Sequence, residues 1–243
     1  MKKTLLAFFF AIAFCGMANA QYYYYRNSAP WDGDKAYSLN IGSNIPINVF
    51  DDVAKNATSF KYHLPLAASF RYFGEKSITE NLSWGYQYEV SWLKYGAEMA
   101  KPSSTAGQSQ FSSLDKWDLL LDARLTLGYY FTDNFELVGG VGIGYCLIYG
   151  YNTLKYETND LTGVEVPNSR KTDNGIMYLT FDPNIDAYLA ANYYLNDNVF
   201  LTLTLRDRIS IPLSSVIGSE ESGDKPLSQY GIALFGIGYK IIR

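Results

Sequence analysis

The sequence predicts an all-β fold: an eight-stranded antiparallel transmembrane β-barrel with short periplasmic turns and long extracellular loops. Three observations predict it. The 243 residues include 22 Tyr, 14 Phe, 4 Trp and 20 Gly, a composition that favours strands over helices. Long segments alternate between apolar and polar residues, as successive side chains of a strand do. Short and long connections alternate along the chain, which is typical of bacterial outer-membrane barrels.

The first twenty residues have the pattern of a secretory signal peptide. Two lysines precede an apolar run from Leu5 to Phe14, and a motif of small residues ends at Ala20. The run is about half as long as the roughly 20 apolar residues of a spanning helix. We expect residues 1–20 to be a signal peptide cleaved after Ala20, residues 21–34 a short periplasmic segment, and residues 35–243 the barrel. The tyrosines of residues 22–25 fit either an interfacial anchor or a disordered leader.

Eight segments carry the alternation, and the fourth is the clearest. In that segment Trp117 and Tyr129 lie about 12 steps apart, which at roughly 3.3 Å per step and a tilt near 40° spans about 30 Å, close to the thickness of a bilayer. Pro65 removes a ladder donor from the second segment and predicts a bulge or kink there. The predicted strands cover residues 37–41, 60–72, 82–92, 117–131, 135–149, 177–193, 199–209 and 233–241.

Turn-forming residues define the connections. Thr132-Asp133-Asn134 and Asn196-Asp197-Asn198 each predict a tight hairpin. A longer turn is expected over Phe73 to Asn81. Four long and mostly polar stretches are predicted as loops on the opposite side, at residues 45–58, 96–116, 152–174 and 210–228.

The volume of the barrel decides which face points outward. Eight strands enclose a space only just wide enough for side chains, and the bulky aromatic face would overfill it. The other face is rich in Gly, Ser and Ala, so the bulky face should contact lipid, because an apolar belt of this size would aggregate in water. The predicted aromatic girdle consists of Phe60, Tyr62, Phe70, Tyr72, Trp84, Trp92, Trp117, Tyr129, Phe131, Phe135, Tyr149 and Tyr239.

The same alternation places charged residues inside the barrel. Both signs are present, and isolated charges in a narrow lumen would be unfavourable, so we expect a paired and hydrogen-bonded network that fills the lumen. A path for ions or small solutes through the same groups is the alternative. The predicted lumen residues are Lys61, Arg71, Glu89, Asp118, Asp122, Arg124, Asp186, Arg206, Arg208 and Lys240.

The sequence predicts no catalytic, cofactor or metal site. His63, the single histidine, is expected to face inward near the outer rim, without a partner that would make it a general base. Cys146 is expected to be a small inward-facing apolar residue. Without the predicted leader, 18 basic residues remain against 24 acidic ones, so nucleic acid is not an expected partner.

The whole predicted mature chain resembles the OmpA/OmpX-like outer-membrane β-barrel superfamily, including PorT-like barrel-domain proteins. The resemblance is carried by the signal peptide, the eight alternating segments, the tight turn between Phe131 and Phe135, and the closing stretch from Phe235 to Ile241. This chain ends Ile241-Ile242-Arg243 and lacks the terminal aromatic residue that is common in the family. Such motifs specify architecture well and activity poorly.

The resemblance implies location in the outer membrane of a Gram-negative cell, with membrane lipid and the barrel assembly machinery as partners. Three functions are compatible with it. The first is a structural or surface-interaction role in which the long loops meet an extracellular protein or surface ligand, with the segment from Leu154 to Val166 able to form a protruding hairpin that binds by strand addition. The second is a narrow channel for small solutes or ions, and the third is a lipid-modifying enzyme that uses His63.

Overall fold

A computed structural model describes residues 34–47, 57–178, 183–210 and 228–241. The predicted signal peptide and almost all of the predicted periplasmic segment lie outside the described residues. The same holds for most of the two loops predicted at residues 45–58 and 210–228. Among the described residues no helix is long and apolar enough to cross a membrane.

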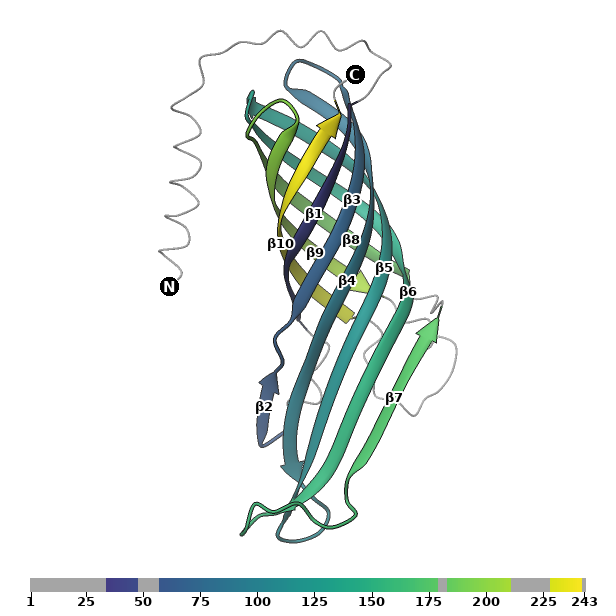
Figure 1. Cartoon of the computed structure of the whole chain (residues 1–243), viewed down its shortest axis with the longest axis vertical. Helices are drawn as coiled ribbons and strands as arrows, with labels where there is room; N and C mark the ends of the chain where they lie inside the picture. The colour runs from purple at the N-terminus through teal and green to yellow at the C-terminus, as the bar shows by residue number, and fades with distance from the viewer. Residues whose placement is uncertain (1–33, 48–56, 179–182, 211–227, 242–243) are drawn as a thin grey trace.

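Eight of the described strands close into a ring. Each strand pairs with its two neighbours, every pairing is antiparallel, and the last strand pairs with the first. The eight-stranded antiparallel barrel predicted from the sequence is therefore confirmed (Figure 1). In ring order the strands are β1 (Asp34–Pro46), β3 (Leu66–Ser77), β4 (Leu82–Pro102), β5 (Gln108–Thr132), β6 (Phe135–Asn159), β8 (Pro183–Tyr194), β9 (Val199–Ser210) and β10 (Ser228–Ile241).

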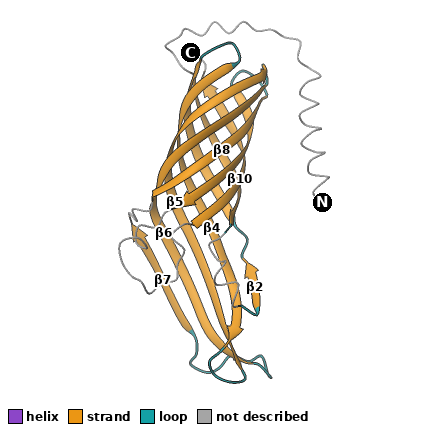
Figure 2. Cartoon of the chain, turned by 180° about the vertical axis from the view of Figure 1, so that it is seen from behind, coloured by secondary structure: helices purple, strands orange, loops and turns teal. Residues whose placement is uncertain are grey.

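Three of these strands continue beyond the ring as an extension of the same sheet. The distal parts of β4, β5 and β6 remain paired and are flanked by β2 (Ser59–Tyr62) and β7 (Lys171–Tyr178), in the order β2-β4-β5-β6-β7. Figure 2 shows this extension projecting from one end of the barrel. The loops predicted at residues 96–116 and 152–174 are therefore largely wrong: their polar composition hid paired strands that lie outside the apolar belt and need no lipid-facing side chains.

The turns at the opposite end are short. β5 passes into β6 through Asp133 and Asn134, and β8 passes into β9 at residues 195–198, so both predicted tight turns are confirmed. The predicted turn over Phe73 to Asn81 is too long, because β3 continues to Ser77. Of the strand predicted over residues 177–193, Met177 and Tyr178 belong to β7 and residues 183–193 belong to β8, and residues 179–182 lie outside the described residues.

The face of the sheet to which odd-numbered side chains point is reversed in two strands where the barrel meets the extension. In β3 the inward residues are odd-numbered, as Ala67 opposite Leu93 shows. In β2 the even-numbered Tyr62 lies opposite the buried Ala97, so the break around Pro65 reverses the faces of β2. A second reversal occurs in β6, where Leu147 is the extra residue of a bulge.

The barrel interior is filled in layers. An apolar layer of six buried residues closes the end nearest the extension, and aromatic side chains close the other end. Polar and charged residues lie between the two layers. The first layer contains Ala67, Leu93, Leu120, Cys146, Ile232 and Leu234, and the second contains Ala36, Tyr194 and Phe200, packed against Phe73 and Tyr130.

Close packing in the aromatic layer predicts a large difference between two glycines of β10. A Cβ on Gly238 would overlap the ring of Phe200, which is 0 % exposed and cannot move aside, whereas a Cβ on Gly231 would have its nearest neighbour at 3.7 Å. We expect Gly238→Ala to lower the free energy of unfolding by about 2 kcal/mol, and Gly231→Ala to change it by less than about 0.5 kcal/mol. Urea unfolding in lipid vesicles measures both variants, and equal stabilities would contradict this packing.

Candidate functional site

A cluster of seven charged residues occupies the middle of the barrel. Four arginines and three carboxylates point inward from five ring strands, and all are at most 4 % exposed. Glycines on β6 provide the space, since a Cβ on Gly144 would collide with Asp122 and one on Gly142 with Arg124. The cluster consists of Arg71, Glu89, Asp122, Arg124, Asp186, Arg206 and Arg208.

Arg206 and Arg124 each contact all three carboxylates. The guanidinium of Arg206 lies 3.0 Å from Glu89, 2.9 Å from Asp122 and 2.8 Å from Asp186. Arg124 donates hydrogen bonds to the same three groups. Mutual pairing of this kind compensates the loss of hydration that burial of charges causes. The result is a closed polar core rather than a set of separate surface ion pairs.

Arg71 and Tyr188 connect this core to the next layer. Arg71 donates to the Tyr188 hydroxyl at 2.9 Å and to Thr204 at 2.7 Å, and its guanidinium lies 5.1 Å from the centre of the Tyr188 ring. The side of the cluster nearest the extension meets the apolar layer that contains Leu120 and Ile232. Side chains thus occupy the lumen on both sides of the charges.

A second polar cluster lies at the end of the barrel with the short turns. Lys240 is 3.3 Å from Asp34 and 3.4 Å from Glu75, and it donates to the Tyr130 hydroxyl at 3.0 Å. Glu136 accepts hydrogen bonds from Asn192 and Tyr194, each at 2.9 Å. The sequence reasoning did not include the two glutamates, although Glu136 lies on the inward face of its segment and Glu75 lies within what was predicted to be a turn.

The ten predicted lumen residues have four different positions in the structure. Seven form the central cluster, and Lys240 belongs to the second cluster. Asp118 lies on the inner face near Tyr95, beyond the apolar layer. Lys61 is exposed on β2, and its predicted place in the lumen is wrong because the break at Pro65 turns it outward.

The outer surface of the ring is apolar. Aliphatic residues of the ring point away from the lumen, among them Leu39, Leu125, Val141 and Ile143, which are 62–65 % exposed. A continuous exposed belt of this kind on a closed ring has lipid as its natural surroundings. By its architecture the chain is a closed, eight-stranded antiparallel β-barrel of the membrane-spanning type.

The outward-facing aromatics of this barrel include nine of the twelve residues predicted for the girdle. Three are placed differently. Phe60 and Tyr62 lie on the inner face of the extension because of the break at Pro65, and Phe60 packs against Tyr95. Tyr149 points inward because of the bulge at Leu147 and packs against the apolar layer. The nine are Phe70, Tyr72, Trp84, Trp92, Trp117, Tyr129, Phe131, Phe135 and Tyr239.

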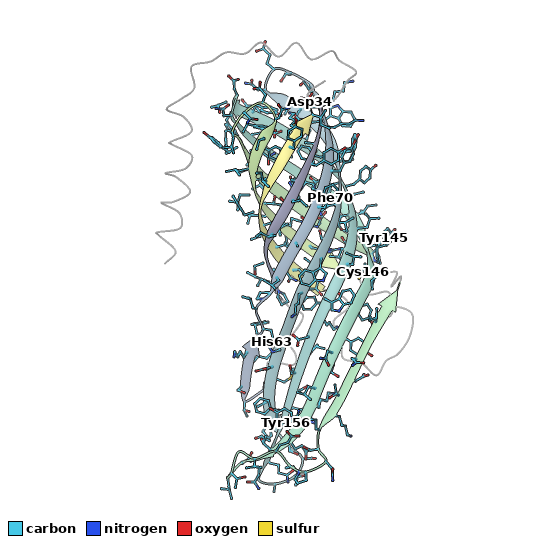
Figure 3. All side chains as sticks on the ribbon, in the orientation of Figure 1. Asp34, His63, Phe70, Tyr145, Cys146 and Tyr156 are labelled. Carbon is cyan, nitrogen blue, oxygen red and sulfur yellow. The ribbon has the colours of Figure 1, made fainter. Side chains whose placement is uncertain are left out.

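His63 lies on the outer face of the extension and not inward as predicted (Figure 3). Its Nδ1 is 2.7 Å from Asp115 and its Nε2 is 3.3 Å from Glu98. The His63 and Asp115 side chains sit beside Gly96, where a Cβ would collide with both. The hydrogen bond to Asp115, together with the charges of both carboxylates, raises the pKa of His63 above 6.5 despite partial burial.

Comparison with known proteins gives structural neighbours only. No protein-family model and no curated protein matches the sequence. Ail, the attachment invasion locus protein of Yersinia pestis, is 9 % identical over 86 % of this chain and 99 % of its own, with a TM-score of 0.42. Neisserial surface protein A is 11 % identical over 88 % and 100 % of the two chains (TM-score 0.36). OprG from Pseudomonas aeruginosa is 12 % identical over 87 % and 97 % (TM-score 0.35). The fold assignment rests on the closed ring and its apolar belt.

No described group of three or more His, Cys, Asp and Glu side chains is arranged to hold a metal ion. Cys146 is buried near the bulge, and its thiol donates to the carbonyl oxygen of Ile148 at 3.5 Å. His63 has two carboxylate partners, which the sequence did not reveal because they come from β4 and β5. The His63 imidazole can hold a proton between two acids, and no hydroxyl or thiol in the described part of the chain forms a hydrogen bond with it.

The shared contacts of Arg206 predict a large effect of its removal. Arg206→Met leaves three buried carboxylates with fewer cations, so we expect the free energy of unfolding to fall by about 3–5 kcal/mol. The matched control is Lys94→Met, an exposed residue of β4, for which the change should stay within about 0.5 kcal/mol. Urea unfolding in vesicles reports both values, and a neutral Arg206→Met would show that the cluster does not stabilise the barrel.

The position of His63 predicts a pH dependence of the extension. A raised folded-state pKa means that His63 contributes stability fully below pH 6.5 and loses this contribution as the pH rises through the folded-state value. Because His63 is the only histidine, its imidazole resonances can be followed by NMR in detergent micelles. We expect a pKa above 6.5 that falls in Asp115→Asn, and a value that is unchanged in that variant would refute the pairing.

Proposed function

We propose that this protein acts at the cell surface, as an outer-membrane barrel whose extension sheet meets a partner outside the cell. One observation supports this most directly: β4, β5 and β6 remain paired far beyond the apolar belt. The pairing extends to Pro102 of β4, Gln108 of β5 and Asn159 of β6. A barrel that only filled the membrane would have no need of such strands. The short turns at the other end fit the periplasmic side of the membrane.

The far end of the extension is held together by specific bonds. The backbone N–H of Asp160 donates to the carbonyl oxygen of Gly107 at 2.9 Å, and the Ser109 hydroxyl donates to Asp160 at 2.7 Å. These contacts tie the β4–β5 hairpin to the connection between β6 and β7. Leu161 is 95 % exposed at this tip. A preorganised tip with an exposed apolar side chain is suited to protein recognition, because little order has to be gained on binding.

Strand β7 offers the second feature suited to a protein partner. It pairs with β6 on one side, and among the described strands no other pairs with it. Its eight residues contain no proline, so the free side can accept a further strand. Lys171 and Asp173 place charge on this edge, which opposes uncontrolled aggregation while leaving a specific partner possible.

The proposed role predicts loss of attachment when the tip is removed. Replacing residues Leu154 to Val166 with a two-residue turn should abolish the protein-dependent attachment of displaying cells to surfaces coated with extracellular protein. The control is Asp133→Gly in a periplasmic turn, which should leave attachment unchanged. Both variants must first show the heat-dependent gel mobility of a folded barrel. Full attachment by the shortened protein would refute the proposal.

The filled lumen supports a function that does not involve conducting ions or solutes. The seven charged residues of the central cluster are 0–4 % exposed, with the apolar layer directly beside them. We therefore expect purified protein in a planar bilayer to give no stable single-channel currents in 1 M salt, a condition that favours detection. Reproducible unitary currents that change in size in Arg206→Met would instead make the protein a channel.

A further inference from the structure

Glu136 is a buried carboxylate without an ionic partner. It is 1 % exposed, and among the described residues no Lys, Arg or His lies within ion-pair distance of it. Lys240, a buried cation at this end of the barrel, is bound to Asp34 and Glu75 instead. A buried charge without a counter-charge is strongly unfavourable, so this carboxylate needs a proton or a cation beside it.

The two oxygens of Glu136 have different surroundings. Oε2 accepts hydrogen bonds from Asn192 and Tyr194. Oε1 accepts no hydrogen bond from the described residues. It lies beside Gly128 and Ser83, where a Cβ on Gly128 would be 2.5 Å from both Oε1 and the Ser83 hydroxyl oxygen. The unoccupied side of the carboxylate therefore faces a space that a glycine keeps open.

A cavity of about 10 Å³ occupies that space, with room for about one water molecule. Oxygen-bearing side chains from five strands line it. One of them, Asn192, is 2 % exposed and has a buried Oδ1 without a hydrogen-bond partner. The oxygen-bearing lining residues are Glu75, Ser83, Gln87, Thr126, Glu136, Tyr188 and Asn192.

The lining specifies the chemistry of an occupant. Carboxylate, amide and hydroxyl oxygens without nitrogen or sulfur ligands suit a hard cation. Glu75 is engaged by Lys240 and by the Tyr130 hydroxyl. Glu136 is therefore the carboxylate of this lining that has no ion-pair partner among the described residues, and its charge is the one for the occupant to balance. We propose that this cavity binds one small monovalent cation, of the size of sodium, between Glu136 Oε1 and Asn192 Oδ1. The site is independent of the proposed surface function.

Ion-dependent stability of the wild-type protein tests the proposal without any variant. The temperature midpoint of the heat-dependent gel shift is measured in detergent micelles at pH 8, in sodium, potassium or choline chloride at equal ionic strength. Because a ligand that binds only the folded state stabilises it, the midpoint should be higher in sodium by a few degrees than in choline. Equal midpoints in sodium and choline would overturn the proposal, as would an equal rise with potassium.

Two substitutions locate the effect. Glu136→Gln should remove the sodium dependence and raise the midpoint in choline, because the uncompensated charge is gone. Glu98→Gln, a control on the surface of the extension, should keep the full sodium dependence. A sodium effect that persists in Glu136→Gln would place the ion elsewhere and overturn the assignment. If only calcium chloride raised the wild-type midpoint, the occupant would be divalent and the proposal would be wrong.

Discussion

The ion-pair cluster inside the barrel is the interaction on which the rest of the structure depends. Four arginines and three carboxylates meet where the ring is too narrow for water to replace them, and two of the arginines bridge all three acids. Five strands contribute to the cluster and the glycines of β6 make room for it. Placing these groups inside forces their neighbours along each strand to point outward, which creates the apolar belt.

The end of the belt is also where the chain changes its construction. The break at Pro65 and the bulge at Leu147 both lie at the junction between barrel and extension, and each reverses the alternation of one strand. β4 and β5 cross the same level without a reversal. Because β4 and β5 continue straight through this level while the chain is interrupted at Pro65 and at Leu147 on either side of them, β4, β5 and β6 leave the ring together. The extension is therefore connected to the barrel by backbone pairing and not by a flexible linker.

The sequence predicted the ring and most of the cluster because alternation is dictated by the narrow lumen. Arg71, Glu89 and Asp122 could be assigned by counting every second residue within one strand. Counting failed for Phe60, Lys61 and Tyr149, because a single extra or missing residue inverts all positions beyond it. The polar composition of the extension led to a prediction of loops there, because a sheet with water on both faces needs no apolar stripe and so shows no alternation.

Partners from distant strands could not be found from the sequence at all. His63 has its carboxylates on β4 and β5, at sequence separations of 35 and 52 residues. Glu136 and Glu75 meet the same cavity from β6 and β3. Such pairings depend on strand register, which local composition specifies only weakly. Inward polar residues identify candidates, and the register decides which of them meet.

Quenching of tryptophan fluorescence by brominated lipid tests most directly whether the bulky face contacts acyl chains. Trp84 and Trp92 are 45 % and 37 % exposed on the outside of the ring. In vesicles whose acyl chains carry bromine, we expect both tryptophans to be strongly quenched, while aqueous iodide has little effect on them. The account would be contradicted if the brominated acyl chains left these tryptophans unquenched and the protein stayed soluble without detergent.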